Sequence, residues 1–438
     1  MSTNLKSLCR YIFPAMGGLF ATYLYNVVDG IFVGQGVGSA ALGAVNIGVP
    51  FITFAVAIAA MFPMGGGTVV AIRMGREDKE GANHAFMTAF LLTLLASLLL
   101  TLIGMAFSRQ IVDLSGGRTL SHTMRDMAAD YLFYYCAFSV PMLMSTCLSV
   151  FVRNDGSPAL SFVGMCVGAG ANIFLDWLFI FPMKMGVVGA AIASGLGQVF
   201  SVAVLLSHFV RKRGSLRFRR FPVSGALIGK ICKRGVPEAA SQLTTPVTAL
   251  CYNLMLARLV GDIGVSTFSV LSFIYSLVNA ILSGTAQGLQ PLWGLCYGER
   301  DTDGMNLYFR WGIRINAILS VVIYVLLFLF AEPVIQIFNR DPELVQNASA
   351  ALSLFGLSFI PMALNLIYTA FLYSTKRTLQ ADAISLSRGV VLKAAAIFCM
   401  PVLFGIDVIW LAPFAAELLT LVLALVLSRD CKLAECRD

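Results

Sequence analysis

Twelve runs of about 20 mostly apolar residues follow one another along this 438-residue chain, and they limit its fold more than any other feature. A helix needs about 20 apolar residues to cross about 30 Å of hydrocarbon. Only 12% of the residues are charged, whereas soluble domains carry about 25%. Runs of this length predict helices rather than membrane-barrel strands, so we expect an all-α integral membrane protein. The runs lie at residues 11–34, 45–72, 86–107, 130–152, 160–182, 187–210, 232–257, 267–297, 309–330, 350–373, 381–404 and 407–428.

The positive charges predict how the chain is oriented. Lys and Arg accumulate in the cytoplasmic segments of multi-pass proteins. If the N-terminus is cytoplasmic, 23 of the 31 Lys and Arg lie in inside segments, nine of them within residues 211–234. We therefore expect a multi-pass protein of the plasma (inner) membrane with both termini in the cytoplasm. The net charge of +8 is explained by this asymmetry and by the basic loop at residues 211–234, which suits the anionic head groups of membrane lipids. No nucleic-acid partner is therefore expected.

The second half of the chain repeats the first. A shift of 223 residues aligns Pro14 with Pro237 and Asp78 with Asp301. Because each half holds an even number of runs, the halves share one orientation, and their pseudo-twofold axis is predicted along the membrane normal. Two such six-helix bundles are a transporter architecture, although a fold alone names no substrate. The predicted division is an N-lobe at residues 1–210, a basic cytoplasmic linker at 211–231, and a C-lobe at 232–438 with a short cytoplasmic tail.

Four polar residues of the first half are predicted to lie at a similar depth in the membrane. Ionisable groups there cost about 2.5 to 3.5 kcal/mol and are functional candidates by default. Counting the helical rise from the predicted outer ends places Asp29, Asn172, Asp176 and Ser194, which belong to three helices of the first half, roughly 7 to 15 Å below the outer surface. Asn172 and Asp176 are four residues apart and so share a helix face. These residues are predicted to form a cation-coupling site.

Two carboxylates in an apolar bundle repel each other and are poorly solvated. Such a pair can hold a proton, or its oxygens can hold a hard cation such as Na⁺. A structural reading stays open, in which Asp29 and Asp176 cap a neighbouring helix or act as buried hydrogen-bond acceptors. Asn172 and Ser194 can equally be packing polar residues.

The second half carries a different set of polar residues. Span 267–297 has a stripe of neutral polar side chains on one helix face, at Tyr275, Asn279, Ser283, Gln287 and Gln290. The stripe predicts either a substrate cavity or interhelical hydrogen bonds. In the first half the matching positions are apolar and include Met64, which offers adaptable packing to a substrate.

Three further charges have two readings each. Lys393 and Glu417 are predicted to meet in mid-membrane as an ion pair, which is either structural or functional. Glu238 follows Pro237 at the predicted inner start of a span, where an acid favours a helix N-terminus. A helix cap and a substrate-cation site are both consistent with Glu238.

Over essentially its whole length, the sequence resembles the multidrug and toxic compound extrusion (MATE) transporters. The resemblance rests on Pro14 and on five motifs, which together are specific: YNVVDGIFVGQGVGSAALGAVNI (25–47), RNDGSPALSFVG (153–164), NIFLDWLFIF (172–181), MGVVGAAIAS (185–194) and RGVPEAASQL (234–243).

This resemblance implies twelve helices in two lobes and secondary active export of amphipathic or cationic small molecules, in antiport with H⁺ or Na⁺ by alternating access. In the prokaryotic branch with the cation site in the N-lobe, the motif residues correspond to Tyr25, Asp29, Asn172, Asp176 and Tyr131. Ser194 stands where the site usually has Thr and keeps the hydroxyl. Pro14 matches the proline at which the first helix is proposed to bend. Thr245 occupies the place of the Glu used by another branch, which argues against a coupling site in the C-lobe.

Two other functions remain as alternatives. A lipid or lipid-linked oligosaccharide flippase of the same superfamily would be expected to have more basic residues within the membrane. A membrane-embedded transferase would need a further acidic or His cluster, which His84, His122 and His208 do not supply. We expect a transporter and not an enzyme, acting as a monomer among membrane lipids. It is expected to need no cofactor beyond the coupling ion and to bind no metal other than Na⁺.

Overall fold

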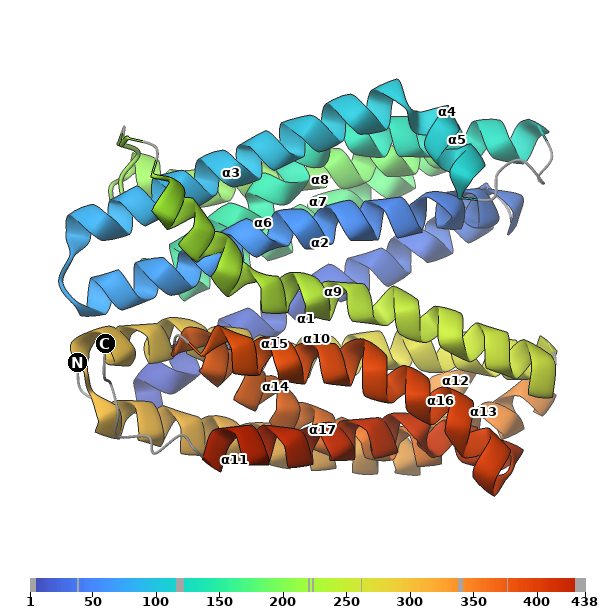
Figure 1. The fold of residues 1–438 in the computed structure, drawn as a ribbon. Helices are drawn as coiled ribbons and strands as arrows, with labels where there is room; N and C mark the ends of the chain where they lie inside the picture. Colours follow the sequence, from blue (N-terminus) through green and yellow to red (C-terminus); the bar gives the residue numbers. More distant parts are fainter. Residues whose placement is uncertain are drawn as a thin grey trace. The chain divides into compact units, whose positions relative to one another are not determined.

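The computed structural model describes residues 5–37, 39–115, 122–219, 221–222, 224–260, 262–337, 342–375 and 377–429. The predicted tail beyond residue 429 lies outside these ranges. The chain forms two compact units, and each is built of helices, with no strand among the described residues (Figure 1). One unit is Phe13–Ala239, and the other combines Met1–Ile12 with Ala240–Asp438.

The unit Phe13–Ala239 is a bundle in which α7 packs most extensively against α8, and α2 packs against α3, α5 and α6. Its helices are α1 (Leu5–Gly36, from Phe13 onward), α2 (Ser39–Gly75), α3 (Lys79–Ala106), α4 (Ser108–Leu114), α5 (His122–Ala137), α6 (Ser139–Asn154), α7 (Pro158–Ile180), α8 (Gly186–Val210) and the first part of α9 (Gly225–Leu259).

The other unit packs α10 and α11 against α14, and α16 and α14 against α17. Its helices after α9 are α10 (Asp262–Glu299), α11 (Thr302–Leu329), α12 (Ala331–Gln336), α13 (Pro342–Phe355), α14 (Phe359–Ser374), α15 (Thr378–Leu386), α16 (Leu392–Phe404) and α17 (Ala412–Arg429). Short 3₁₀ turns form η2 (Gly356–Ser358) and η4 (Ile406–Leu411), and η3 (Ser387–Val391) is a π-helical turn.

The predicted all-α membrane fold is confirmed. Among the described residues, ten helices are long and apolar enough to cross a membrane, and the pair α5 and α6 makes eleven if it counts as one span bent by 47°. The sequence predicted that pair as one run at 130–152. The chain instead bends at Phe138, between the two helices. Helix α9 covers the predicted run 232–257 but is not among the ten.

Corresponding turns of the two halves have nearly the same backbone geometry. Asp78 precedes α3 and Asp301 precedes α11, and each carboxylate accepts a 2.8 Å hydrogen bond from the N–H of the glycine three residues later. The residues before them, Glu77 and Arg300, both have a φ of 60°. Helix α11 matches α3 residue for residue at both ends after a shift of 223. The repeat read from the sequence is therefore present in the local structure.

The predicted linker at 211–231 belongs to the compact unit Phe13–Ala239. Asp155, in the turn between α6 and α7, has a side chain only 1% exposed. Its two oxygens accept hydrogen bonds from the backbone N–H groups of Ser215 and Leu216, from the Ser215 hydroxyl at 2.9 Å, and from His208 Nε2 at 2.8 Å. The units divide within α9 at 239/240, whereas the sequence predicted lobe boundaries at 210/211 and 231/232. These bonds hold the loop to the turn between α6 and α7.

We expect Asp155→Asn to loosen this loop. Burial alone raises the pKa of Asp155, but the bonds from His208, Ser215 and Leu216 outweigh it and hold the pKa below its usual value. The carboxylate therefore stabilises the fold at neutral pH, and this contribution is lost as the pH falls below about 4. Each bond to the charged group is worth about 1.5 to 3 kcal/mol.

Trypsin at neutral pH should cut Asp155→Asn faster than wild type among the basic residues 211–219, because the loop opens more often. The thermal midpoint of wild type should also fall more steeply below pH 4 than that of the variant. The exposed Glu80→Gln change is the control. Equal cleavage rates for Asp155→Asn and wild type would show that the carboxylate does not hold the loop.

Helices α2 and α9 approach each other at two glycines. A Cβ added to Gly65 would lie 2.0 Å from the backbone oxygen of Ile231, and one added to Gly235 would lie 2.0 Å from that of Met61. Backbone atoms cannot rotate away as side chains do, so any larger residue must push the helices apart. Glycine at these positions allows the close packing of α9 on α2.

Gly235→Ala is therefore expected to lower the thermal unfolding midpoint of the purified protein, at a cost of about 1 to 3 kcal/mol for overpacking. Gly229→Ala on the same helix is the matched control. A Cβ at Gly229 meets nothing within 4 Å, and alanine is favoured over glycine in a helix by about 1 kcal/mol. An unchanged midpoint for Gly235→Ala would contradict the close packing.

Candidate functional site

Two intramembrane carboxylates, Asp29 on α1 and Asp176 on α7, lie in the unit Phe13–Ala239. Asp176 and Asn172, one turn apart on α7, are fully buried, and Asp29 is half-buried. Tyr25 is one turn before Asp29 on the same face of α1.

Close packing of α7 on α8 positions part of this group. A Cβ added to Gly197 of α8 would lie 2.7 Å from the backbone oxygen of Gly168 and 2.9 Å from Cβ of Asn172. The two backbones therefore nearly touch one turn before Asn172. Asn172 Nδ2 donates a 3.1 Å hydrogen bond to the hydroxyl of Ser194, which is also on α8.

The structure brings together all six residues predicted for the cation site. The carboxyl groups of Asp29 and Asp176 interact electrostatically with each other. Both also interact with the hydroxyls of Tyr25 on α1 and Tyr131 on α5. With Asn172 and Ser194, the group draws on α1, α5, α7 and α8, so four helices contribute to one polar cluster within a single unit.

Four oxygens of this cluster have no hydrogen-bond donor. Oδ1 of Asp29, Oδ1 of Asn172 and both carboxyl oxygens of Asp176 are buried and make no well-formed hydrogen bond to the described residues. The side chains of Asn172 and Asp29 lie near the Asp176 carboxyl group and interact with it. Buried polar atoms in native proteins are nearly always paired, and each exception needs an explanation. A cluster of acceptors without donors fits a proton shared by the carboxyls or a bound cation.

Two members of this neighbourhood were missed by the sequence analysis. Gln198 Nε2 on α8 lies 3.4 Å from the Tyr25 hydroxyl, and Tyr135 on α5 interacts with Tyr25 and Asp29. Gln198 is four residues after Ser194, and Tyr135 is four residues after Tyr131. The one-turn spacing that predicted a shared helix face for Asn172 and Asp176 also relates Gln198 to Ser194 and Tyr135 to Tyr131, so it could have predicted these two residues.

The unit that includes Ala240–Asp438 contains a buried charge cluster around Glu417 on α17. Its Oε1 lies 3.0 Å from Arg388 Nε and 3.5 Å from Lys393 Nζ, and its Oε2 accepts a 2.9 Å hydrogen bond from Asn365 Nδ2. Asn365 is fully buried, and none of the three charged residues is more than 8% exposed. The sequence analysis paired Lys393 with Glu417, and the structure adds Arg388 as the closer partner.

The π-helical turn η3 explains why Arg388 was missed. Lys393 is five positions after Arg388, and in an α-helix that spacing places two side chains about 140° apart. The π turn at Ser387–Val391 inserts an extra residue and brings both cations to Glu417. Such turns occur often at functional sites, but hydropathy and helical periodicity do not reveal them.

The residues predicted for a substrate cavity divide between the two units, with Tyr275, Asn279, Gln287 and Gln290 in one and Met64 and Glu238 in the other. Tyr275 lines a pocket of about 80 Å³ with residues of α9, α10, α13, α16 and α17. The half-buried Asn279, Gln287 and Gln290 do not line that pocket. Met64 is buried in the other unit.

The placement of Glu238 at a helix start is wrong. Helix α9 begins at Gly225, after Ser224, whose hydroxyl accepts a hydrogen bond from Leu227 N–H. Glu238 is therefore in the middle of a helix. It is half-buried and interacts electrostatically with Arg153, which is 5% exposed.

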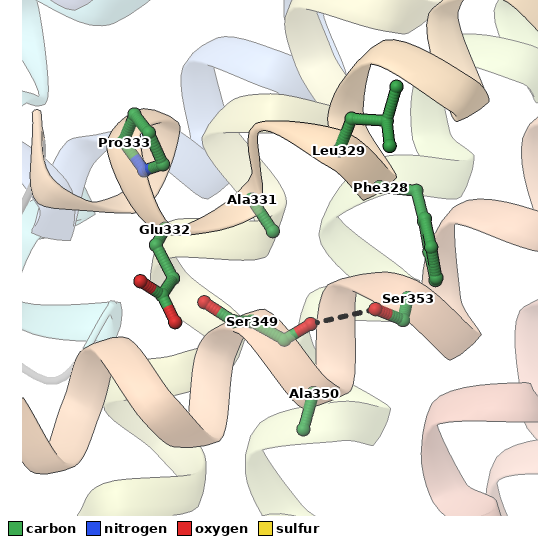
Figure 2. Close-up of a pocket in the computed structure, with 8 residues that line it drawn as sticks. All are labelled: Phe328, Leu329, Ala331, Glu332, Pro333, Ser349, Ala350 and Ser353. Carbon is green, nitrogen blue, oxygen red and sulfur yellow. Dashed lines mark hydrogen bonds between the residues drawn. The ribbon is translucent and has the colours of Figure 1, made fainter.

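A larger hollow of about 370 Å³ lies where α11, α12 and α13 meet (Figure 2). Figure 2 shows Glu332 of α12 beside Ser349 of α13, and the Ser353 hydroxyl donates a 3.0 Å hydrogen bond to the Ser349 backbone oxygen. None of the residues predicted as functional lines this hollow.

Known proteins of similar sequence are bacterial exporters. The chain is 25% identical over 414 residues to the multidrug export protein MepA of Staphylococcus haemolyticus, covering 93% of this chain and 90% of the relative. It is 23% identical to the MepA protein of one Staphylococcus aureus strain, covering 97% of this chain and 94% of that one.

Solved structures share the fold. A MATE crystal structure in complex with MaL6 superposes with a TM-score of 0.91 at 22% identity, over 97% of this chain and 95% of that one. An outward-facing multidrug resistance MATE family transporter of the MOP superfamily gives the same values. A MOP superfamily transporter from Pyrococcus furiosus also superposes with a TM-score of 0.91, at 22% identity over 99% of this chain and 96% of that one.

The MatE family model matches the chain twice, at residues 14–178 and 237–406. The two matches begin at Pro14 and Pro237, which are the prolines related by the 223-residue repeat. Together they cover more than half of the chain. The protein is therefore a multi-pass membrane protein of the MatE family, a family of transporters and not of enzymes.

Proposed function

We propose that the protein exports amphipathic or cationic small molecules in antiport with H⁺ or Na⁺, and that the coupling cation binds between Asp29 and Asp176. The observation that carries the proposal is the set of four buried oxygens without a donor in one cluster. The multidrug export proteins that the chain resembles support a drug-like substrate.

The chemistry of the cluster suits either ion. A proton held between the two carboxyl groups removes their repulsion. Na⁺ is a hard cation, and carboxylate, amide and hydroxyl oxygens are the ligands that hard cations take. Asp29, Asp176, Asn172 and Ser194 offer these oxygens, and the Tyr25 and Tyr131 hydroxyls interact with the same carboxylates.

Pro14 offers a route from ion binding to a change of shape. The chain passes from one compact unit to the other at Ile12/Phe13 in α1, next to Pro14, and at Ala239/Ala240 in α9, close to Pro237. Proline removes a helical hydrogen bond and favours bending. In the proposed cycle an external cation neutralises Asp29 and Asp176, α1 bends near Pro14, and the substrate leaves outward.

Antiport requires the ion and the substrate to favour different states, and their effects on each other's binding are then reciprocal. We place the protein in the plasma (inner) membrane as a monomer, with both termini in the cytoplasm.

Proteoliposomes holding purified protein test the function. Ethidium should move against its gradient when a pH or Na⁺ gradient is imposed, and should stop when that gradient is collapsed by an ionophore. Export driven by neither ion would contradict antiport. Gradient-independent movement of a labelled phospholipid between leaflets, without ethidium transport, would instead favour the flippase alternative.

A further inference from the structure

The cluster around Glu417 carries more positive than negative charge. In their ordinary ionisation states Arg388 and Lys393 bring two positive charges to one carboxylate. All three are buried, and a buried charge needs a partner of opposite sign. One negative charge would complete the cluster.

Of the two cations, Lys393 is the one that can bind a further anionic group. Arg388 is engaged at 3.0 Å by Glu417 and also interacts with the Tyr275 hydroxyl. Lys393 Nζ lies 3.5 Å from the same carboxylate oxygen and 5.3 Å from the centre of the Tyr275 ring. Charge-assisted N–H···O bonds are typically about 2.7 to 2.9 Å, so the ammonium is held only loosely.

Lys393 also lines the 80 Å³ pocket. Hydroxyl groups of Thr248, Ser272 and Ser276 line it too. The Thr248 oxygen is buried and has no hydrogen-bond partner among the described residues, so its O–H is available to a ligand.

The remaining walls of the pocket include Tyr252 and Phe268, whose rings stack at 4.4 Å, and Phe355. The pocket has a volume of about 80 Å³. Positive charge and hydroxyl donors beside aromatic rings suit a carboxylate attached to a ring.

We propose that this pocket, lined by Lys393, Thr248 and Tyr275, binds the carboxylate of a small aromatic acid. The acid completes the charge balance of the Arg388–Glu417–Lys393 cluster, and its ring lies against Tyr252 and Phe268. The site is independent of the cation cluster at Asp29 and Asp176, and it extends the ligands of the protein beyond cations.

Equilibrium dialysis of radiolabelled benzoate and benzamide against the purified full-length protein tests this site. The two probes have nearly the same shape and differ in charge. Benzoate should bind wild type at least about tenfold more tightly than benzamide, since 1.4 kcal/mol of charge recognition gives that factor. Lys393→Gln should reduce benzoate binding to the benzamide level, whereas Lys393→Arg should retain it. The exposed Lys184→Gln is the control.

Equal binding of the two probes by wild type, or unchanged benzoate binding by Lys393→Gln, would overturn the proposal. If Lys393→Gln does not elute as a folded protein, Thr248→Val serves instead because it leaves every charge in place. It should weaken benzoate binding more than benzamide binding, because a hydrogen bond to a charged acceptor is roughly twice as strong as a neutral one. Unaltered benzoate binding would again overturn the site. The assay uses no ion gradient, so its outcome is separate from that of the export experiment.

Discussion

Asp29→Asn is expected to abolish export driven by an ion gradient. Asparagine keeps the shape of the side chain but cannot take up a proton or supply a charged oxygen to Na⁺. Without a change of charge, the ion no longer has a different affinity for the two conformations, and the coupling free energy vanishes. The ratio of ethidium export with and without an imposed gradient should fall to about one. Asp176→Asn should behave in the same way, because both carboxyl groups are needed for the pair.

Asp130→Asn is the matched control for this experiment. It removes an exposed carboxylate beside Tyr131, on α5. Its export should respond to the gradient as wild type does, which separates a general change of membrane charge from loss of the pair. Gradient-driven export by Asp29→Asn at the wild-type rate would rule out the proposed coupling site.

Glu417→Ala is expected to have the largest effect on stability. It leaves the Arg388 and Lys393 charges buried without their carboxylate. It also removes one of the two acceptors of Asn365 Nδ2, while the backbone oxygen of residue 417 remains. Removing one partner of a buried ion pair costs about 3 to 5 kcal/mol. The folded fraction in size-exclusion chromatography and the thermal midpoint should both fall sharply.

A compensating variant shows whether uncompensated charge causes this loss. Replacing all three charged residues, in Arg388→Met, Lys393→Met and Glu417→Met together, removes the charges while retaining side-chain volume. Apolar replacements of buried ion clusters are often neutral or stabilising. The triple variant should therefore be more stable than Glu417→Ala. A triple variant as unstable as the single one would show that the charges matter through a specific geometry and not through their balance.

Hydropathy predicted the membrane helices well but not where each one begins. The predicted run starts at residue 232, while α9 starts at Gly225, because the charged Lys230 lowers the hydropathy without interrupting the helix. Hydropathy reports which residues suit hydrocarbon, whereas a helix end depends on hydrogen-bonding groups such as the Ser224 hydroxyl. The error at Glu238 follows from this difference.

Spacing and depth together were sufficient to predict a cluster in the first unit. Asn172 and Asp176 are one turn apart, and the helical rise placed Asp29 and Ser194 at a matching depth, so ordinary α-helical geometry predicted their neighbours. The same geometry fails at Arg388, where the π turn changes the face that a side chain occupies. Asp29 and Asp176 were predictable because their helices are regular. The Arg388–Glu417–Lys393 cluster was predicted incompletely because the helix that carries Arg388 and Lys393 is interrupted by the π turn.

Labelling of Asp29 by a carbodiimide, followed by mass spectrometry, tests the central claim most directly. The reagent modifies protonated carboxyl groups, and Asp29 is half-buried rather than inaccessible. If the pair binds Na⁺, added Na⁺ should protect Asp29 at constant pH. If it binds H⁺, labelling of Asp29 should persist to a higher pH than labelling of the exposed Asp130, with or without Na⁺. Labelling of the exposed Asp130 should not respond to Na⁺. Labelling of Asp29 that does not respond to Na⁺ and follows the same pH dependence as Asp130 would contradict a coupling site at Asp29 and Asp176.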